Sequence, residues 1–248
     1  ELEERELTLI YRLLNKELAA EVFVNMEPEY QEQLIRAFSD SELREVLDEL
    51  YVDDAVDLIE EMPSTLVKRI LKHTDPETRK SINEILKYPE DSAGSIMTIE
   101  YVDLKRSMTV ADAFMRIRRT GVDKETIYTC YVTDSKRKLK GVVTVKELLL
   151  ADENATIREI MEDNVISVNT SEDKEVVADL FDKYDLLALP VVDNENRLVG
   201  IITVDDAIDV MQEEITEDME LMAAITPTDK PYLKMSVFEN FKKRIPWL

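Results

Sequence analysis

One order of elements occurs twice between residues 96 and 204, and this duplication limits the fold more than any other feature of the sequence. In the first copy, a helical pattern at 110–119 precedes two strand-like runs at 127–133 and 139–145. A second helical pattern follows at 145–151. Helical and strand-like hydrophobic periods that alternate in this way predict a small α/β unit.

The second copy repeats both the motifs and the strands. Gly141-Val-Val-Thr-Val145 returns as Gly200-Ile-Ile-Thr-Val204, 59 positions later, and Ile96-Met97 returns as Ile160-Met161, 64 positions later. The two offsets differ because the first copy contains a short insertion near 121–125. Strand-like runs at 187–192 and 197–204 complete the match. We therefore predict two consecutive domains of one α/β fold.

The chain before the duplication has a different character. Residues 1–93 contain no glycine, and their apolar residues recur at helical spacing. The strings 21–26, 45–50 and 57–62 resemble one another weakly. The breaks between helices carry helix-start residues, namely Pro28, Ser39 with Glu42, Ser64 after Pro63, and Pro76 after Asp75. These features predict an N-terminal all-α domain of repeated helix hairpins, packed as a small superhelix.

Composition excludes several classes of function. The chain has 54 acidic and 31 basic side chains, a net charge of −23, which disfavours a nucleic-acid partner and favours cations. The single cysteine (Cys130) and single histidine (His73) exclude a disulfide framework, a Cys-rich zinc site and His-based catalysis. We expect Cys130 to pack inside a strand and His73 to lie exposed at a helix end. The longest apolar run, 186–192, is much shorter than the ~20 residues of a membrane-spanning helix, and no targeting segment is visible, so we expect a soluble chain.

The repeated motifs resemble those of a known family. The Ile-Met strings, Leu189-Pro-Val-Val-Asp193 and Leu198-Val-Gly-Ile-Ile-Thr-Val-Asp-Asp206 look like a tandem pair of CBS domains, a Bateman module. Together with the acidic helical domain, the string 88–94 and the trailing 243–248, they resemble the cytosolic region of the MgtE-type magnesium channels and transporters over essentially the whole chain. The resemblance implies a bacterial, non-enzymatic homodimer paired through its CBS domains. It also implies a membrane domain that is absent here and a place at the cytoplasmic face of the inner membrane.

On this basis we expect an α + α/β architecture in four parts. An acidic helical repeat domain occupies 1–92, and the two CBS domains occupy 93–153 and 154–212. The remainder, 213–248, would be a linker and a connecting amphipathic plug helix that leads to the absent membrane domain.

Two acidic clusters carry the main functional signal. Residues 198–229 contain nine acids and no Lys or Arg, and residues 40–61 contain ten acids with Arg44 as the only base. Like charges at i,i+4 destabilise a helix by roughly 0.2–0.5 kcal/mol per pair, so these rows suggest an external positive partner. The alternative is a solvated acidic face, with Asp53 only capping a helix. Carboxylates without His or Cys are hard ligands that favour Mg²⁺, Ca²⁺ or Mn²⁺.

The resemblance assigns particular acids to interdomain Mg²⁺ binding. The residues that it implies as ligands are Glu21, Asp53, Asp57, Asp185, Asp206, Asp209, Glu217 and Asp218.

ATP or another adenine nucleotide is a second candidate ligand. CBS domains bind such nucleotides through a Gly-φ-φ-Thr-x-x-Asp string, which the second copy retains with Thr203 and Asp206. The first copy has Thr144 with Glu147 in place of Asp, which makes the site there more doubtful. A purely structural use of the motif stays open. No Gly-rich phosphate loop is present, which disfavours nucleotide hydrolysis.

The charge reverses after Pro227. Basic residues interleave with apolar ones, which predicts an amphipathic gating helix at the edge of a membrane domain, or a helix docked on the chain's own acidic body. Its assigned residues are Lys230, Lys234, Phe238, Lys242, Lys243 and Arg244.

The sequence and the resemblance together predict the Mg²⁺-sensing regulatory part of a magnesium transporter, which closes the pore when Mg²⁺ bridges the helical and CBS domains. The main alternative is an adenine-nucleotide sensor that regulates a partner protein, with the acids only solubilising. A metal-dependent hydrolase is disfavoured because no positioned base or oxyanion donor is evident.

Overall fold

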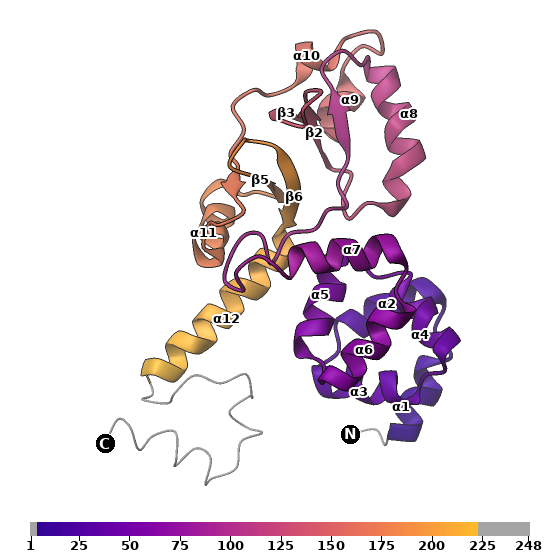
Figure 1. Cartoon of the computed structure of the whole chain (residues 1–248). Helices are drawn as coiled ribbons and strands as arrows, with labels where there is room; N and C mark the ends of the chain where they lie inside the picture. Colours follow the sequence, from indigo (N-terminus) through magenta and orange to yellow (C-terminus); the bar gives the residue numbers. More distant parts are fainter. Residues whose placement is uncertain (1–3, 223–248) are drawn as a thin grey trace.

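A computed structural model describes residues 4–222, with the side chains of residues 4, 5 and 220 excepted (Figure 1). The N-terminal part consists of seven helices: α1 (Glu4–Tyr11), α2 (Lys16–Val24), α3 (Pro28–Ala37), α4 (Asp40–Leu47), α5 (Val52–Glu61), α6 (Ser64–His73) and α7 (Pro76–Ile85). The predicted all-α domain is confirmed.

The helices begin where the sequence signals predicted. Ser39 and Glu42 form a reciprocal capping box at α4, with Glu42 N 3.3 Å from Ser39 Oγ and Ser39 N 2.8 Å from Glu42 Oε2. Asp75 Oδ1 accepts hydrogen bonds from the first turn of α7, and Pro28 and Pro76 lie at first helical positions. Because these signals act within four residues, the sequence alone locates them.

His73 corrects one expectation. It is the last residue of α6, but only 8% of it is exposed, and its Nε2 lies 3.4 Å from Oδ2 of Asp40. Packing of α6 against α4 covers the imidazole, so a helix end is not a solvent-exposed position here.

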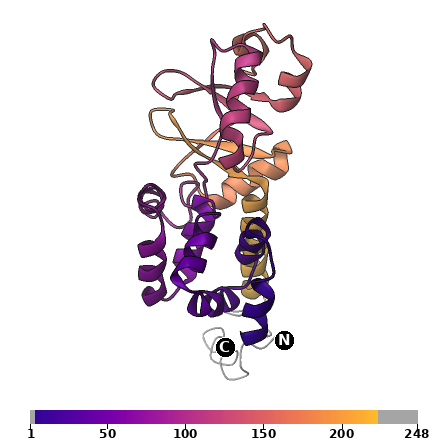
Figure 2. The ribbon, with the colours of Figure 1, turned by 90° about the vertical axis from the view of Figure 1, so that its right-hand side faces the viewer.

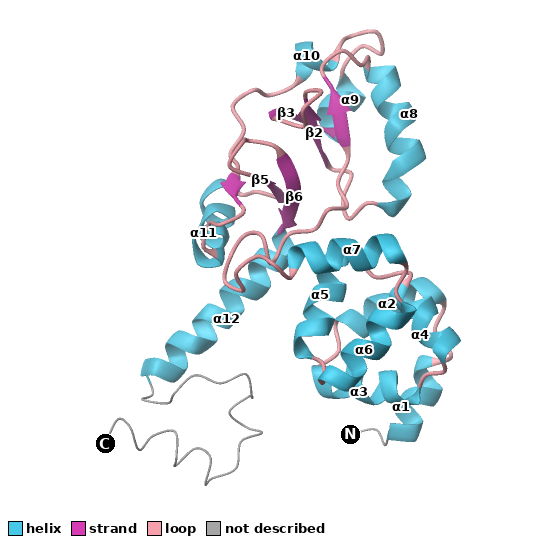
Figure 3. Cartoon of the chain, viewed as in Figure 1, coloured by secondary structure: helices cyan, strands magenta, loops and turns pink. Residues whose placement is uncertain are grey.

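The second part contains two three-stranded sheets of identical topology (Figure 3). In the first, β1 (Asp103–Lys105) runs parallel to β2 (Thr129–Thr133), which runs antiparallel to β3 (Leu139–Thr144). The second repeats this order with β4 (Val168–Asn169), β5 (Ala188–Val192) and β6 (Leu198–Thr203). The very short strands β1 and β4 were not predicted, because two or three residues carry no readable period.

The two longer helices of each copy also correspond, whereas the short helix at the start of the second copy has no helical counterpart in the first. The first copy contains α8 (Val110–Thr120), the short 3₁₀ turn η1 (Gly121–Asp123) and α9 (Val145–Leu150). The second contains α10 (Ile157–Ile160), α11 (Lys174–Tyr184) and the long α12 (Val204–Met222). Cys130 is fully buried in β2, as predicted. The predicted duplication is confirmed.

The two copies exchange their leading segments. Thr98, which precedes β1, pairs with Ile201 of β6, and Glu162, which precedes β4, pairs with Val142 of β3. This crossing explains the glycine of each repeated string. A Cβ on Gly200 would lie 2.7 Å from the carbonyl oxygen of Thr98, and a Cβ on Gly141 would lie 2.8 Å from the corresponding atom of Glu162. The Ile-Met and Gly-φ-φ-Thr motifs are therefore contact partners across the pair.

The segment after α7 is bound to the second copy. Ala93 N donates to Glu172 O over 2.7 Å, and Lys174 N donates to Asp91 O over 3.1 Å. These bonds join the helical domain's end to the start of α11, while α12 extends away from the sheets, past the helical domain (Figure 2). Within residues 4–222, no helix is both long and apolar enough to cross a membrane. The predicted gating residues 230–244 lie outside the described residues.

Candidate cation site between the helical domain and the duplicated α/β domains

Carboxylates from four separate segments lie near one another where α5 approaches the start of α12. Their mutual electrostatic influence joins Asp53, Asp54 and Asp57 of α5 to Asp205 and Asp206 of α12. Glu100 and Glu125, from the first α/β copy, act on the same group. We call these seven residues the interface carboxylates.

Asp53 occupies the centre of the group. The N-cap of α5 is Tyr51, so Asp53 does not cap the helix as the alternative interpretation required. Only 7% of Asp53 is exposed, and its Oδ1 has no hydrogen-bond partner. Burial first, and then the carboxylate of Asp206, raise the pKa of Asp53 well above its usual value. A carboxyl group without a hydrogen-bond partner at Oδ1 is thus held out of water.

The acids around Asp53 also have raised pKa values. Desolvation, reinforced by nearby carboxylates, raises the pKa of Asp54 and of Asp206 to about 6 and that of Glu125 to about 8. Asp57 is exposed at the rim, yet partial desolvation and the charge of Asp206 raise its pKa to about 7. Burial and neighbouring negative charge cause these shifts, so an added positive charge would stabilise the ionised group.

The donor set fits a hydrated divalent cation. Two buried carboxylate oxygens, Asp53 Oδ1 and Glu125 Oε2, lack partners, and every available ligand atom is oxygen. In the part of the chain that the structure describes, no three acids, histidines or cysteines converge tightly enough to form a complete metal cluster. Such an arrangement suits Mg²⁺, which retains several waters and needs only one or two direct carboxylates.

The remaining predicted ligands lie apart from this group. Glu21 on α2, Asp185 in the left-handed C-cap of α11, and Glu217 and Asp218 on α12 are exposed. Asp209 is exposed one turn beyond Asp205, and desolvation, with the charges of Glu213 and Asp205, raises its pKa. The structure thus brings together Asp53, Asp57 and Asp206 from the predicted set.

Sequence reasoning missed Glu100 and Glu125 and left Asp54 and Asp205 out of the ligand set. A signal for Glu125 was available, because the insertion at 121–125 is the one length difference between the two copies. It places an acid from the first copy against α5, where Tyr51 Oη also donates to Lys124 O over 3.4 Å.

Each predicted nucleotide motif serves to begin a helix. Thr203 Oγ1 donates to Asp206 Oδ2 over 2.5 Å at the start of α12, and Thr144 Oγ1 donates to Glu147 Oε2 over 2.9 Å in a capping box at α9. Thr203 is buried and Asp206 faces α5, whereas Glu147 is exposed. The first copy's motif is therefore the more exposed of the two, and which copy binds a nucleotide stays a prediction.

One fixed cation lies near the interface carboxylates. Lys174 Nζ is 3.4 Å from both Asp91 Oδ1 and Glu213 Oε2, with its side chain 18% exposed. Its charge also lowers the otherwise raised pKa of Glu60 on α5. Lys174 thus neutralises the edge of the interface but not its centre.

Comparison with known proteins gives concordant matches along the chain. Residues 1–91 match the family model described as the MgtE intracellular N domain, and residues 93–154 and 157–213 each match the CBS domain model. The magnesium transporter MgtE of Thermus thermophilus is 39% identical over 97% of this chain, which covers 54% of that transporter. The Bacillus subtilis transporter of the same name is 33% identical over 90% of this chain and is covered to 49%. The chain thus spans about half of these relatives.

Two solved structures superpose on the model at a TM-score of 0.80. One is the cytosolic domain of the Mg²⁺ channel MgtE in complex with ATP, 41% identical, covering 84% of this chain and 86% of that chain. The other is the soluble part of a magnesium transporter, 33% identical, covering 86% of this chain and 84% of that one.

Proposed function

Because the chain belongs to the MgtE family of magnesium transporters, which are not enzymes, we propose that its helical domain and CBS pair together sense Mg²⁺ and close a pore when the ion is abundant. The single observation that carries this proposal is the group of interface carboxylates, above all the buried, unpartnered Oδ1 of Asp53. The same proposal assigns the chain to the cytoplasmic face of a bacterial inner membrane, as a homodimer attached to its own membrane domain.

The mechanism is electrostatic. Asp53, Asp54 and Asp57 repel Asp205 and Asp206 when no cation is present, which favours separation of α5 from α12. A bound hydrated Mg²⁺ would supply two positive charges between them. α5 and α12 then approach, and α12 transmits the approach beyond Met222.

The free energy needed to shift the equilibrium between the separated and the closed arrangement sets the number of bound ions. A shift from 1:99 to 99:1 needs about 5.5 kcal/mol of differential binding. A site at ten times its Kd supplies roughly 1.4 kcal/mol, so about four ions must act together. Seven interface carboxylates, with Asp209, Glu217 and Asp218 further along α12, could serve that many; Glu21 and Asp185 complete the proposed set.

Adenine-nucleotide binding is the second candidate function. The relative solved with ATP supports this candidate, and the proposed contacts are Thr203 and Asp206 in the second copy or the more exposed Thr144 and Glu147 in the first. In that case the nucleotide would act with Mg²⁺ or in its place.

Small-angle scattering separates these proposals. We expect compaction between zero and tens of millimolar Mg²⁺, loss of that response in Asp53→Asn with Asp206→Asn, and a normal response in Asp182→Asn, a matched exposed acid on α11. Compaction by ATP without Mg²⁺ would support the nucleotide sensor instead. Titrations with Ca²⁺ and Mn²⁺ define the preferred ion.

A further inference from the structure

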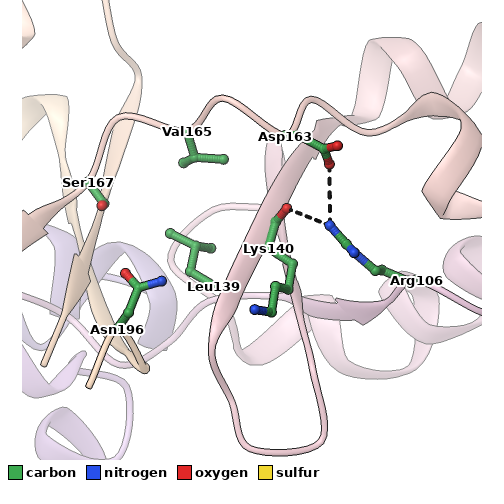
Figure 4. A pocket seen from close by; sticks show the side chains of 7 residues that line it. All are labelled: Arg106, Leu139, Lys140, Asp163, Val165, Ser167 and Asn196. Atoms are coloured by element: carbon green, nitrogen blue, oxygen red, sulfur yellow. Dashed lines mark hydrogen bonds and ion pairs between the residues drawn. The ribbon is translucent and has the colours of Figure 1, made fainter.

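Two adjoining cavities lie at the far side of the CBS pair from the interface carboxylates, and both are lined by Arg106. The first, of about 320 Å³, also has Lys140, Asp163, Ser167 and Asn196 in its wall (Figure 4). The second, of about 580 Å³, is lined by Ser107, Thr156, Arg158 and Glu159 together with Arg106. No step of the proposed Mg²⁺ response uses these residues.

Not all hydrogen-bond donors of Arg106 have a good acceptor. Its Nη2 makes two long contacts, 3.3 Å to Lys140 O and 3.4 Å to Asp163 Oδ1, as Figure 4 shows. Its Nε is buried and has no acceptor. Because the Arg106 side chain as a whole is 42% exposed, a ligand can reach its outer guanidinium nitrogens, so the site favours a further acceptor group.

The charge and the donors around Arg106 favour an anion. Arg158 and Lys140, whose Nζ lies 3.7 Å from Asp134 Oδ2, add two cations, while Glu159 accepts a hydrogen bond from Thr156 N at 2.7 Å. Hydroxyl groups of Ser107 and Ser167 and the amide of Asn196 supply neutral donors, while the Thr156 side chain is engaged in a capping box with Glu159. In a chain of net charge −23, this gathering of donors contrasts with the acidic interface.

We propose that the two cavities form a binding site for a phosphate group, either free or carried by a small molecule. An arginine fork with flanking hydroxyls is suited to tetrahedral oxyanions. The site is separate from the Thr144–Glu147 motif, because Lys140 and Thr144 lie near opposite ends of β3, about 13 Å apart at ~3.3 Å per residue. A bound phosphate would join the loop after β1 to the segment that connects the two copies.

The test is an amide NMR titration of the chain with inorganic phosphate, with sodium chloride at matched ionic strength as the blank. We expect saturable shifts at Ser107 and Arg158. Arg106→Gln should weaken binding about tenfold or more, since hydrogen bonds to charged groups are lost, and the exposed Arg158→Gln should weaken it severalfold.

Asp163→Asn should strengthen phosphate binding, because it removes a competing carboxylate from Arg106. This gain distinguishes a ligand site from a merely structural ion pair. Arg119→Gln, an exposed arginine on α8, is the matched control and should bind as the parent does.

Parallel titrations with AMP and ATP identify the source of the phosphate. A nucleotide that binds more tightly than inorganic phosphate and depends on Arg106 supports a nucleotide-borne group. No saturable shift with any of these probes, unchanged affinity in Arg106→Gln and Arg158→Gln, or weaker binding in Asp163→Asn would each overturn the proposal.

Discussion

Asp53 of α5 is buried against the start of α12, where the carboxylate of Asp206 raises its pKa beyond the effect of burial. The two residues belong to different domains, and Oδ1 of Asp53 has no partner. The closed arrangement therefore contains an electrostatic cost that a cation would relieve, and the first two predictions depend on it.

Replacement of Asp53 by asparagine should stabilise the chain in the absence of divalent ions. Asn keeps the shape and removes the buried charge, so we expect a gain on the order of 1 kcal/mol or more at pH 8. Urea unfolding in the presence of a chelator measures it. The added stabilisation by Mg²⁺ should shrink in the same variant, and an unchanged Mg²⁺ effect would contradict the role of Asp53.

The stability of the cation-free chain should fall as the pH rises from about 5.5 to about 8, above the range in which acids with lowered pKa values, such as Glu42, titrate. Glu125, Asp57, Asp54 and Asp206 have folded pKa values of about 8, 7, 6 and 6, above ordinary values of 4.5 for Glu and 3.8 for Asp. The folded state thus binds more protons than the unfolded state, and the protons are lost across this window. Urea midpoints from pH 5 to 8.5 measure the slope.

Glu125→Gln provides the control for this pH dependence. It should flatten the profile chiefly between pH 7 and 8.5, because only the Glu125 contribution is removed. Mg²⁺ should flatten the whole profile. A midpoint that rises with pH in the presence of a chelator would contradict the assigned shifts.

Lys174→Met should raise the Mg²⁺ concentration at the midpoint of compaction about two- to fivefold, as expected for the loss of a partly exposed ion pair. The reason is that Glu213 loses its fixed counterion and Glu60 on α5 loses an attractive charge. Interdomain distance measurements during a Mg²⁺ titration follow the change. Lys174→Arg should behave like the parent, and so should Lys183→Met, a charge loss at an exposed position of the same helix.

Gly200→Ala should destabilise the CBS pair by about 1–3 kcal/mol, because a Cβ there would lie 2.7 Å from both the carbonyl oxygen of Thr98 and the Sδ of Met97. Gly121→Ala should cost less, since its nearest contact is a side-chain methyl of Ile127 at 2.9 Å, which can move. Thermal unfolding compares the two variants. Equal stability of Gly200→Ala and the parent would contradict the proposed reason for the glycine in each repeated string.

Much of the candidate site could be predicted because its signals are local. The three aspartates of α5 lie within one and a half turns, and Asp205 and Asp206 lie in the first turn of α12, the helix that follows β6 directly. The acidic rows without basic neighbours indicated where a cation would be needed. What spacing alone did not reveal was that Asp53, and not a neighbouring acid, would be buried, or that Glu125 would join it.

The sequence by itself determined the element order, the helix starts at Ser39 and Asp75, the duplication and the excess of negative charge, because each of these depends on residues close together in the chain. Only the tertiary structure decided which acids face one another, and that Thr203 is covered while Glu147 is open. The physical reason is that burial and Coulomb interactions depend on distances between α5, the first copy and α12, which are set when the segment after α7 binds to α11.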